Sequence, residues 1–385
     1  MEYSIDYNNT IKEFINNNII TNEEYNNLDM EMRNISISTG NIQINGETEY
    51  NGPKYKLKSI LVPNSNYSLI KNQILKVYKL LSNAINKPKI KTIFLIGHSH
   101  LSIENYVYLS NYTSFDTINP QVSFGTDLYV YNQLKKMENI KLKTFEQTTY
   151  SVVSLVEDGN EIVEKEQTIT DSIEDREYTF DLHLALLSYI FPTFKHKIQI
   201  CPIWINIKSP SAISSLAKSL SQFYAKEDYF FIFSTNLTHF GKLYDFMWDD
   251  KLLPILQDNA HMQKIISEKY RNAENYDNFN SYIKTEFKEM LRNEKKKDDI
   301  MKLIQILDRH VIEAIKNKNN FEVEKLTNIV YCKEILLTLV EIIKDNRYLN
   351  IDTIGYEIIQ CKMLEEMRDM NFVSLVSMVF YEIAK

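Results

Sequence analysis

From residue 54 onward, the chain alternates between two patterns of apolar positions. The short, continuously apolar runs are Lys58–Pro63, Lys91–Gly97, Lys197–Asn206 and Asp228–Thr235. The stretches with helical periodicity between them are Tyr67–Ile85, Asp181–Phe194 and Ser211–Lys226. A strand that is apolar on both faces must be covered on both faces, normally by helices. The alternation therefore predicts an α/β fold with a mostly parallel central sheet flanked by helices.

The segments outside this alternation suggest additions to one domain. We interpret residues 1–53 as an N-terminal extension and residues 54–385 as the α/β domain, with a charged helical insertion at about 244–299. Residues 121–176 look irregular, and the acids of 157–177 suggest an exposed loop. Near the C-terminus, Phe372–Ile383 is apolar enough to join the sheet or to pack on it.

Composition narrows the classes of partner. With 44 basic and 51 acidic side chains, the net charge of −7 gives no support for generic coating of nucleic acid, although a local basic contact with a ribonucleoprotein stays open. Cys201, Cys332 and Cys361 stand singly, so we expect neither a disulfide framework nor a zinc ribbon. The sequence shows no signal-peptide pattern and no apolar run of about 18 residues. We therefore predict a cytoplasmic protein without a membrane partner.

Polar side chains follow the predicted strands, at the edge where parallel sheets bind ligands. Asn64 follows the first run, His98 and His100 follow the second, and Asn236 and His239 follow the fourth. A further histidine, His183, lies in the first turns of its predicted helix. Imidazole can bind a transition metal or act as an acid and base. Each of these residues alone is also an ordinary loop or core residue.

Three segments, taken in order, resemble motifs of the MEMO family, which is related to the LigB-type class III extradiol dioxygenases. They are TIFLIGHSHL (residues 92–101), YTFDLHLALL (178–187) and FIFSTNLTHFG (231–241). Weaker matches are SILVPNSNYS (59–68) and LIQILDRHVIEAI (303–315). The resemblance implies a LigB/MEMO-like α/β fold with a metal or substrate cleft at the strand ends.

The resemblance also assigns roles to the polar residues at the strand ends. His100 matches a metal-ligating histidine of the family, while His183 and His239 match cleft histidines. Two positions depart from the family pattern: Tyr178 replaces the first histidine of the helix motif, and Asn236 replaces an aspartate.

The other departures concern metal ligands. A second metal-ligating histidine of the family is replaced by Asn64, and the family's cysteine ligand falls near Ile354, where no thiol exists. Asp352 or Cys361 could substitute only if the backbone differs there. An amide oxygen is a poor ligand for a transition metal compared with imidazole or thiolate.

These departures leave three hypotheses. The first is a MEMO-like pseudoenzyme without a cofactor, which binds a protein or a large macromolecular assembly through the cleft and the added surfaces. The second is a metal-dependent oxidoreductase or dioxygenase-like enzyme in which His98 and His100 share iron, copper or zinc. The third is a metal-independent hydrolase or small-ligand binder that uses His183 and His239 as acid and base.

Overall fold

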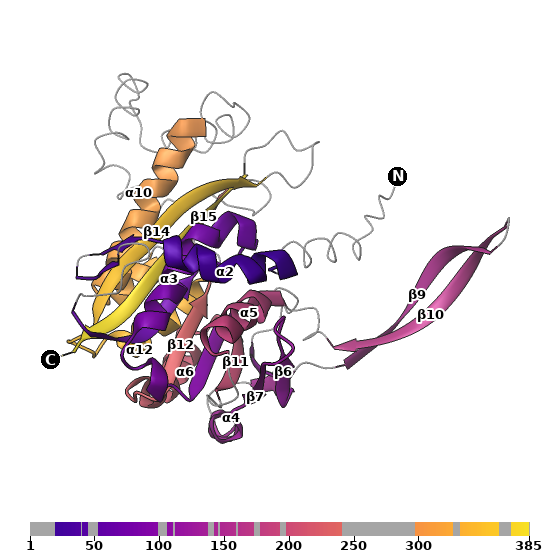
Figure 1. Ribbon diagram of the computed structural model, residues 1–385, viewed down its shortest axis with the longest axis horizontal. Coiled ribbons are helices and arrows are strands. Elements are labelled where there is room, and N and C mark those ends of the chain that lie inside the picture. Colours follow the sequence, from indigo (N-terminus) through magenta and orange to yellow (C-terminus); the bar gives the residue numbers. More distant parts are fainter. Residues whose placement is uncertain are drawn as a thin grey trace, which may run out of the picture.

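The computed structural model of the 385-residue chain has a large mixed sheet at its centre (Figure 1). The residues it describes are 20–39, 41–44, 53–98, 106–110, 112–137, 142–144, 147–158, 161–172, 178–192, 198–240, 297–325, 332–361 and 371–384. The four apolar runs form neighbouring strands of this sheet. They are β3 (Tyr55–Val62), β12 (Tyr229–Ser234), β4 (Thr92–Gly97) and β11 (Gln199–Asn206). All three contacts between these neighbours are parallel, which confirms the predicted α/β fold.

The outer strands of the sheet are mostly antiparallel. On one side, β15 (Asn371–Ile383) pairs with β3, and both β13 (His239–Phe240) and β14 (Asn350–Cys361) pair with β15. The C-terminal apolar segment therefore joins the sheet. On the other side, β5 (Tyr106–Leu109) is antiparallel to β11 and parallel to β8 (Leu142–Thr144). Two short strands complete the sheet, β6 (Ser114–Asp116) and β7 (Ser123–Thr126).

Helices cover both faces of the sheet, and each face has its own apolar core. One core holds α2 (Asn22–Asn34), α3 (Tyr67–Asn83) and α5 (Asp181–Ile190). The other core holds α6 (Pro210–Tyr224), α10 (Lys297–Lys316) and α12 (Lys333–Ile343). Along β4, Ile93 and Leu95 enter the first core, while Phe94 and Ile96 enter the second. Because successive strand residues face opposite ways, two covered faces require a continuously apolar run.

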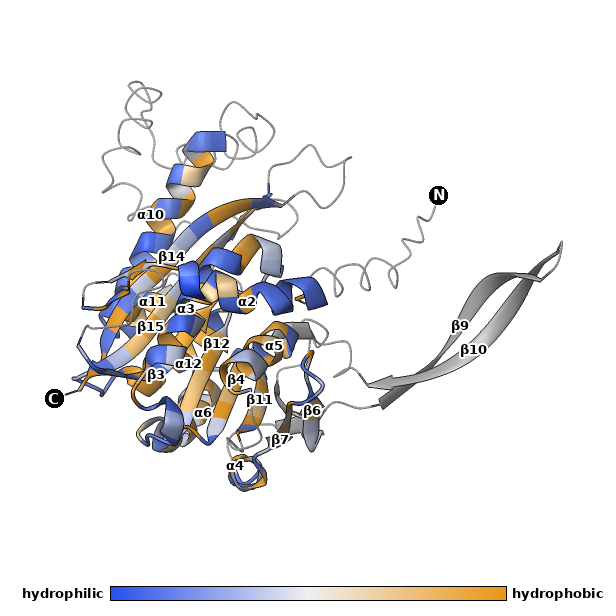
Figure 2. Cartoon of the chain, in the orientation of Figure 1, coloured by the Kyte–Doolittle hydropathy of each residue, from blue (hydrophilic) through white to orange (hydrophobic). Residues whose placement is uncertain are grey.

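Hydropathy follows these layers. Figure 2 shows the hydrophobic colour concentrated on β4, β11 and β12, while α10 carries both colours. The remaining short helical elements are η1 (Lys87–Lys89), α4 (Leu128–Leu134), η3 (Tyr178–Phe180) and α11 (Asn320–Lys325). Within the described part of the chain, no helix is both long and apolar enough to cross a bilayer.

The prediction of an irregular region at 121–176 with an exposed acidic loop was wrong. This region contains β7, α4 and β8, and most of the rest forms a separate antiparallel hairpin of β9 (Gln147–Asp158) and β10 (Glu161–Ser172). Figure 1 shows the hairpin extending away from the central sheet. The sequence carries a signal for it, since two β-branched-rich segments flank Gly159–Asn160, a pair typical of tight turns. The acidic side chains of residues 157–177 led instead to the prediction of an exposed loop.

The described part of the N-terminal extension packs on the domain. Leu28 and Met32 of α2 are buried in the same core as α3 and α5. Two short paired strands, β1 (Ile37–Ser38) and β2 (Gln43–Ile44), add Ile37 and Ile44 to that core. The predicted charged insertion at 244–299 lies outside the described residues, apart from its last three positions, which begin α10.

Candidate functional site

The carboxyl ends of the four central strands meet at one edge of the sheet because these strands are parallel. This edge carries Asn64 just beyond β3, His98 directly after β4, Asn206 at the end of β11, and Asn236 just beyond β12. Asn64, His98 and Asn236 are half-buried, and Asn206 is buried. These residues share one edge because the strands that precede them are parallel neighbours in the sheet. His100 lies outside the described residues.

Asn236 joins the ends of β3 and β12 through two hydrogen bonds. The backbone N–H of Asn64 donates to Oδ1 of Asn236 at 2.9 Å, and Nδ2 of Asn236 donates to the Asn64 carbonyl oxygen at 2.8 Å. An amide offers one donor and one acceptor, whereas an ionised aspartate offers acceptors alone. The replacement of the family's aspartate by Asn236 therefore has a structural consequence, because only the amide can make both bonds.

His98 connects the ends of β4 and β11 in a similar way. Its Nδ1 lies 3.2 Å from the Ile205 carbonyl oxygen, and the Thr179 hydroxyl donates to the His98 carbonyl oxygen at 3.1 Å. The preceding Gly97 permits this packing, since a Cβ there would lie 2.4 Å from Cγ2 of Thr179. Tyr178, the residue that replaces a family histidine, begins η3 beside Thr179.

His239 begins β13, where it pairs with Val373 of β15. It is half-buried, and its Nδ1 lies 3.1 Å from the Leu237 carbonyl oxygen. The residue before it, Thr238, is fully buried and bonds to Asp308 on α10. The position of His239 is thus fixed both by the sheet and by a buried carboxylate.

Asp308 is a residue that the sequence analysis missed. Its side chain is 0 % exposed and accepts hydrogen bonds from the Thr238 hydroxyl at 2.6 Å, the Thr238 backbone N–H at 3.3 Å and the Tyr356 hydroxyl at 2.7 Å. Burial raises the pKa of Asp308, and the hydrogen bonds from Thr238 and Tyr356 oppose that rise. The available signal was an acid on the apolar stripe of a helix, four residues after Ile304.

His183 lies on α5, and its side chain is buried in the core where α5 faces α3. It is 2 % exposed, and its Nδ1 lies 3.0 Å from the hydroxyl of Tyr78 on α3. Burial lowers the pKa of His183 to about 3, so the ring is neutral near pH 7. Its described contacts are those of a hydrogen-bonded core histidine.

Ile354, near which the family's cysteine ligand falls, lies in a strand. Ile354 is half-buried within β14, next to an irregularity in the pairing with β15 between Thr353 and Gly355. A Cβ at Gly355 would lie 2.7 Å from Cγ of Gln73, so the glycine permits close packing of α3 and does not mark a turn. Asp352 accepts a hydrogen bond from Tyr381 at 2.6 Å, and Cys361 ends β14.

The described donors at the family's metal positions do not fit a transition metal. Asn64 offers an amide and Ile354 an aliphatic side chain, whereas such sites use imidazole, thiolate or carboxylate. Among the described residues, no three His, Cys, Asp or Glu side chains lie close enough together to hold a metal ion.

Pockets in the described structure include one beside α5 and one beside α2. A pocket of 280 Å³ lies beside the start of α5, where Phe180, Asp181 and Trp204 line it. A larger pocket of 690 Å³ lies between α2 and the last turns of α3 and α5. Neither pocket is lined by Asn64, His98 or Asn236.

The fold and this edge define an α/β protein whose polar residues gather at the carboxyl ends of parallel strands. The sequence model of the Memo-like protein family matches residues 25–334, from within α2 to the start of α12. The chain belongs to the Memo-like family. No curated protein matches the sequence. A crystal structure of an uncharacterized protein from Escherichia coli K12 is similar at 10% sequence identity, covering 84% of this chain and 98% of that one, with a TM-score of 0.32.

Proposed function

We propose that this Memo-like protein is a non-catalytic member of its family that binds a protein or a large macromolecular assembly. Binding would use the strand-end cleft and the surfaces added around the sheet. The observation that carries the proposal is the pair of hydrogen bonds between Asn236 and the backbone of Asn64. The family pattern has a metal ligand at the position of Asn64 and an aspartate at the position of Asn236. This chain has an amide at both, and the Asn236 amide joins the ends of β3 and β12.

The state of the remaining histidines supports the same proposal. A general base needs a pKa near the working pH and access to a substrate, but burial holds the pKa of His183 at about 3 and encloses its ring. His183 and His239 are then relic residues of a cleft, His183 being held by a core hydrogen bond and His239 by the sheet. Under this proposal the protein needs no cofactor.

The test is the metal content of the protein purified without chelators, measured for wild type and His100→Ala. We expect well under one iron, copper or zinc per chain in both, because a stable site needs about three or four suitable ligands. His310→Ala is the matched control, since His310 is an exposed histidine on α10. About one metal per chain in wild type and His310→Ala, lost in His100→Ala, would overturn the proposal.

A second candidate is a metal-dependent oxidoreductase with rearranged ligands. One observation favours it: His98 and His239 each place Nδ1 near a backbone carbonyl oxygen, as metal-ligating histidines commonly do. In this candidate His98 and His100 share iron, copper or zinc. The metal measurement separates it from the first, because it requires a stoichiometric metal.

The cytoplasmic location and the absence of a membrane partner stay predictions. Cys201 is a buried free thiol, which is the usual state in a reducing compartment. The partner can be sought by crosslinking the full chain in cells and by mapping whether crosslinks start at the strand-end edge.

A further inference from the structure

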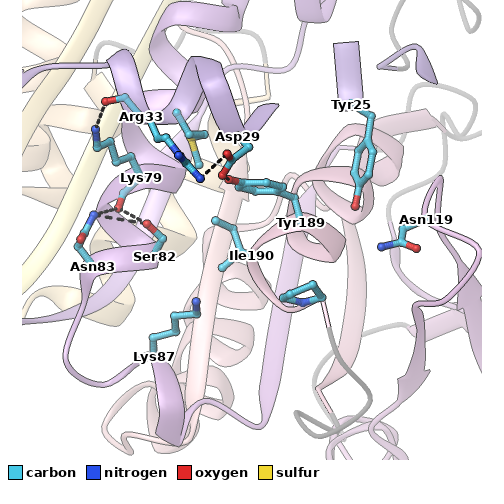
Figure 3. Close-up of a pocket in the computed structure, with 12 residues that line it drawn as sticks. Tyr25, Asp29, Arg33, Lys79, Ser82, Asn83, Lys87, Asn119, Tyr189 and Ile190 are labelled. Carbon is cyan, nitrogen blue, oxygen red and sulfur yellow. Dashed lines mark hydrogen bonds and ion pairs between the residues drawn. The ribbon is translucent and has the colours of Figure 1, made fainter. Parts of the chain in front are cut away.

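The 690 Å³ pocket lies at the end of the sheet opposite to the strand-end edge, and Figure 3 shows the residues that line it. Helix α3 starts after the carboxyl end of β3 and finishes before the start of β4, and α5 finishes before the start of β11. Their last turns, which line the pocket, therefore lie near the amino ends of the parallel strands. The pocket falls in the size range of small-ligand sites, roughly 300–1,000 Å³.

Hydrogen bonds fix α2 as one wall of this pocket. The ammonium group of Lys79 on α3 donates to the carbonyl oxygens of Arg33 and Ile35, at 3.0 and 2.8 Å, at the end of α2. From α5, the Tyr189 hydroxyl donates to Asp29 at 3.0 Å, and Asp29 pairs with Arg33 at 2.7 Å. Because side chains from both neighbouring helices anchor α2, the pocket is formed before any ligand arrives.

The charges on the pocket wall are unbalanced. Arg33, Lys79 and Lys87 are cationic, and Asp29 is the one carboxylate among the lining residues. Lys87 is half-buried, and its ammonium group lies 5.5 Å from the centre of the Phe191 ring. Figure 3 shows this ammonium group pointing toward Ile190.

A half-buried ammonium group without a carboxylate gains from a bound anion. Burial lowers the pKa of Lys87, and none of the described carboxylates acts against that effect. Lys89, two residues further along the chain, lies outside the pocket, and its ammonium group pairs with Glu227 at 2.6 Å. The two lysines of η1 thus differ in the feature that matters: only Lys87 faces the pocket.

The rest of the wall offers neutral polar and aromatic groups. Ser82 and Asn83 lie at the end of α3, and Asn119 lies across the pocket near Tyr25. Burial and Asp29 raise the pKa of Tyr189 to about 12, so its hydroxyl stays a donor at neutral pH. Aromatic faces and amides bind the organic part of a ligand.

We propose that this pocket binds a small organic phosphate ester, with the phosphate at Lys87 and the organic part near Tyr25, Tyr189 and Asn119. A phosphate monoester carries about −1.5 to −2 charges at pH 7, which matches the excess of two cations on the wall. This inference goes beyond the proposed function, because the residues that line the pocket differ from those of the strand-end edge on which the proposed function rests.

The test is calorimetric titration of the full chain at low salt with a panel of probes. The esters are adenosine monophosphate, ribose 5-phosphate and glycerol 3-phosphate; the comparison compounds are inorganic phosphate, adenosine and ribose. We expect at least one ester to bind at least tenfold more tightly than inorganic phosphate and than its own uncharged counterpart. The proposal fails if no ester binds, if inorganic phosphate binds as well as the best ester, or if the uncharged counterpart does.

Matched variants locate the site. Lys87→Gln should weaken binding of the best ester by about tenfold or more, and Lys87→Arg should retain most of the affinity because it keeps the charge. Lys89→Gln removes a cation from the same short helix without touching the pocket, so it should leave the affinity within about twofold of wild type. Equal weakening by Lys87→Gln and Lys89→Gln would show diffuse attraction to surface charge and would overturn the proposal.

Discussion

The two ends of the central sheet use polar side chains in opposite ways. At the carboxyl end, Asn236 bonds to the backbone of the neighbouring strand end, and Asp308 bonds to Thr238 beside His239. At the amino end, the ammonium group of Lys87 faces a pocket and lies 5.5 Å from the centre of the Phe191 ring. At the carboxyl end the polar groups bond to the protein itself, whereas at the amino end a cation faces an open pocket.

Under the phosphate-ester proposal, a small ligand binds near the amino ends of the parallel strands, whereas most α/β sheets bind small ligands at the carboxyl ends. Polar groups that bond to one another stabilise the fold, whereas groups set aside for a ligand are neutral or costly for it. Removing polar groups at the two ends should therefore have different effects on stability.

Asp308→Ala should have the largest effect. The substitution removes the acceptor of three hydrogen bonds and leaves the buried donors of Thr238 and Tyr356 without it. Leaving buried donors unsatisfied costs about 1–3 kcal/mol each, so we expect urea unfolding to show a loss of about 3 kcal/mol.

Two variants calibrate the result for Asp308. Tyr356→Phe removes one of the three hydrogen bonds and should cost about 1 kcal/mol. Glu313→Ala removes an exposed acid from the same helix and should change stability by less than about 0.5 kcal/mol. A loss for Asp308→Ala no greater than that for Glu313→Ala would contradict a structural role for the carboxylate.

Asn236→Asp should be the next largest, although it introduces the residue that the family pattern has there. The aspartate loses the donor to the Asn64 carbonyl oxygen and places an anionic oxygen near that carbonyl. We expect a loss of about 2 kcal/mol in urea unfolding at pH 7. Asn72→Asp on the exposed side of α3 is the control, with an expected change below about 0.5 kcal/mol. An unchanged stability in Asn236→Asp would mean that the amide is not needed to hold the two strand ends.

The layers of this fold were predictable because they follow from local patterns. Each of the four central strands is an apolar run whose alternate residues enter two different cores, and that requirement is visible in the sequence. The likeness of the strand-end motifs to the MEMO family also pointed to the family that the sequence model identifies. Local signals and ordered motifs were sufficient for both conclusions.

The contacts within the two sites were not predictable in the same way. Asn236 and Asn64 are 172 positions apart, and Thr238 and Asp308 are 70 apart, so no local pattern relates them. The pocket depends on the docking of α2, which the sequence suggested to be part of an extension.

Lys87→Gln should have the smallest effect on the free protein and a clear effect in the presence of a ligand. Two contributions oppose each other when the ammonium group is removed: the contact with the Phe191 ring is lost, and the cost of burying a charge disappears. We therefore expect the stability of the free variant to stay within about 0.5 kcal/mol of wild type.

A saturating concentration of the phosphate ester should distinguish the stability of wild type from that of Lys87→Gln. A ligand that binds the folded state alone stabilises it by about 2.7 kcal/mol at a concentration of 100 times its dissociation constant. Thermal unfolding of wild type should shift upward accordingly, and the shift should be smaller in Lys87→Gln because its affinity is lower. Lys89→Gln should match wild type in the presence of the ester, since Lys89 pairs with Glu227 away from the pocket. If instead Lys87→Gln destabilised the free protein as much as Asn236→Asp, Lys87 would be structural, and the contrast between the two ends of the sheet would be lost.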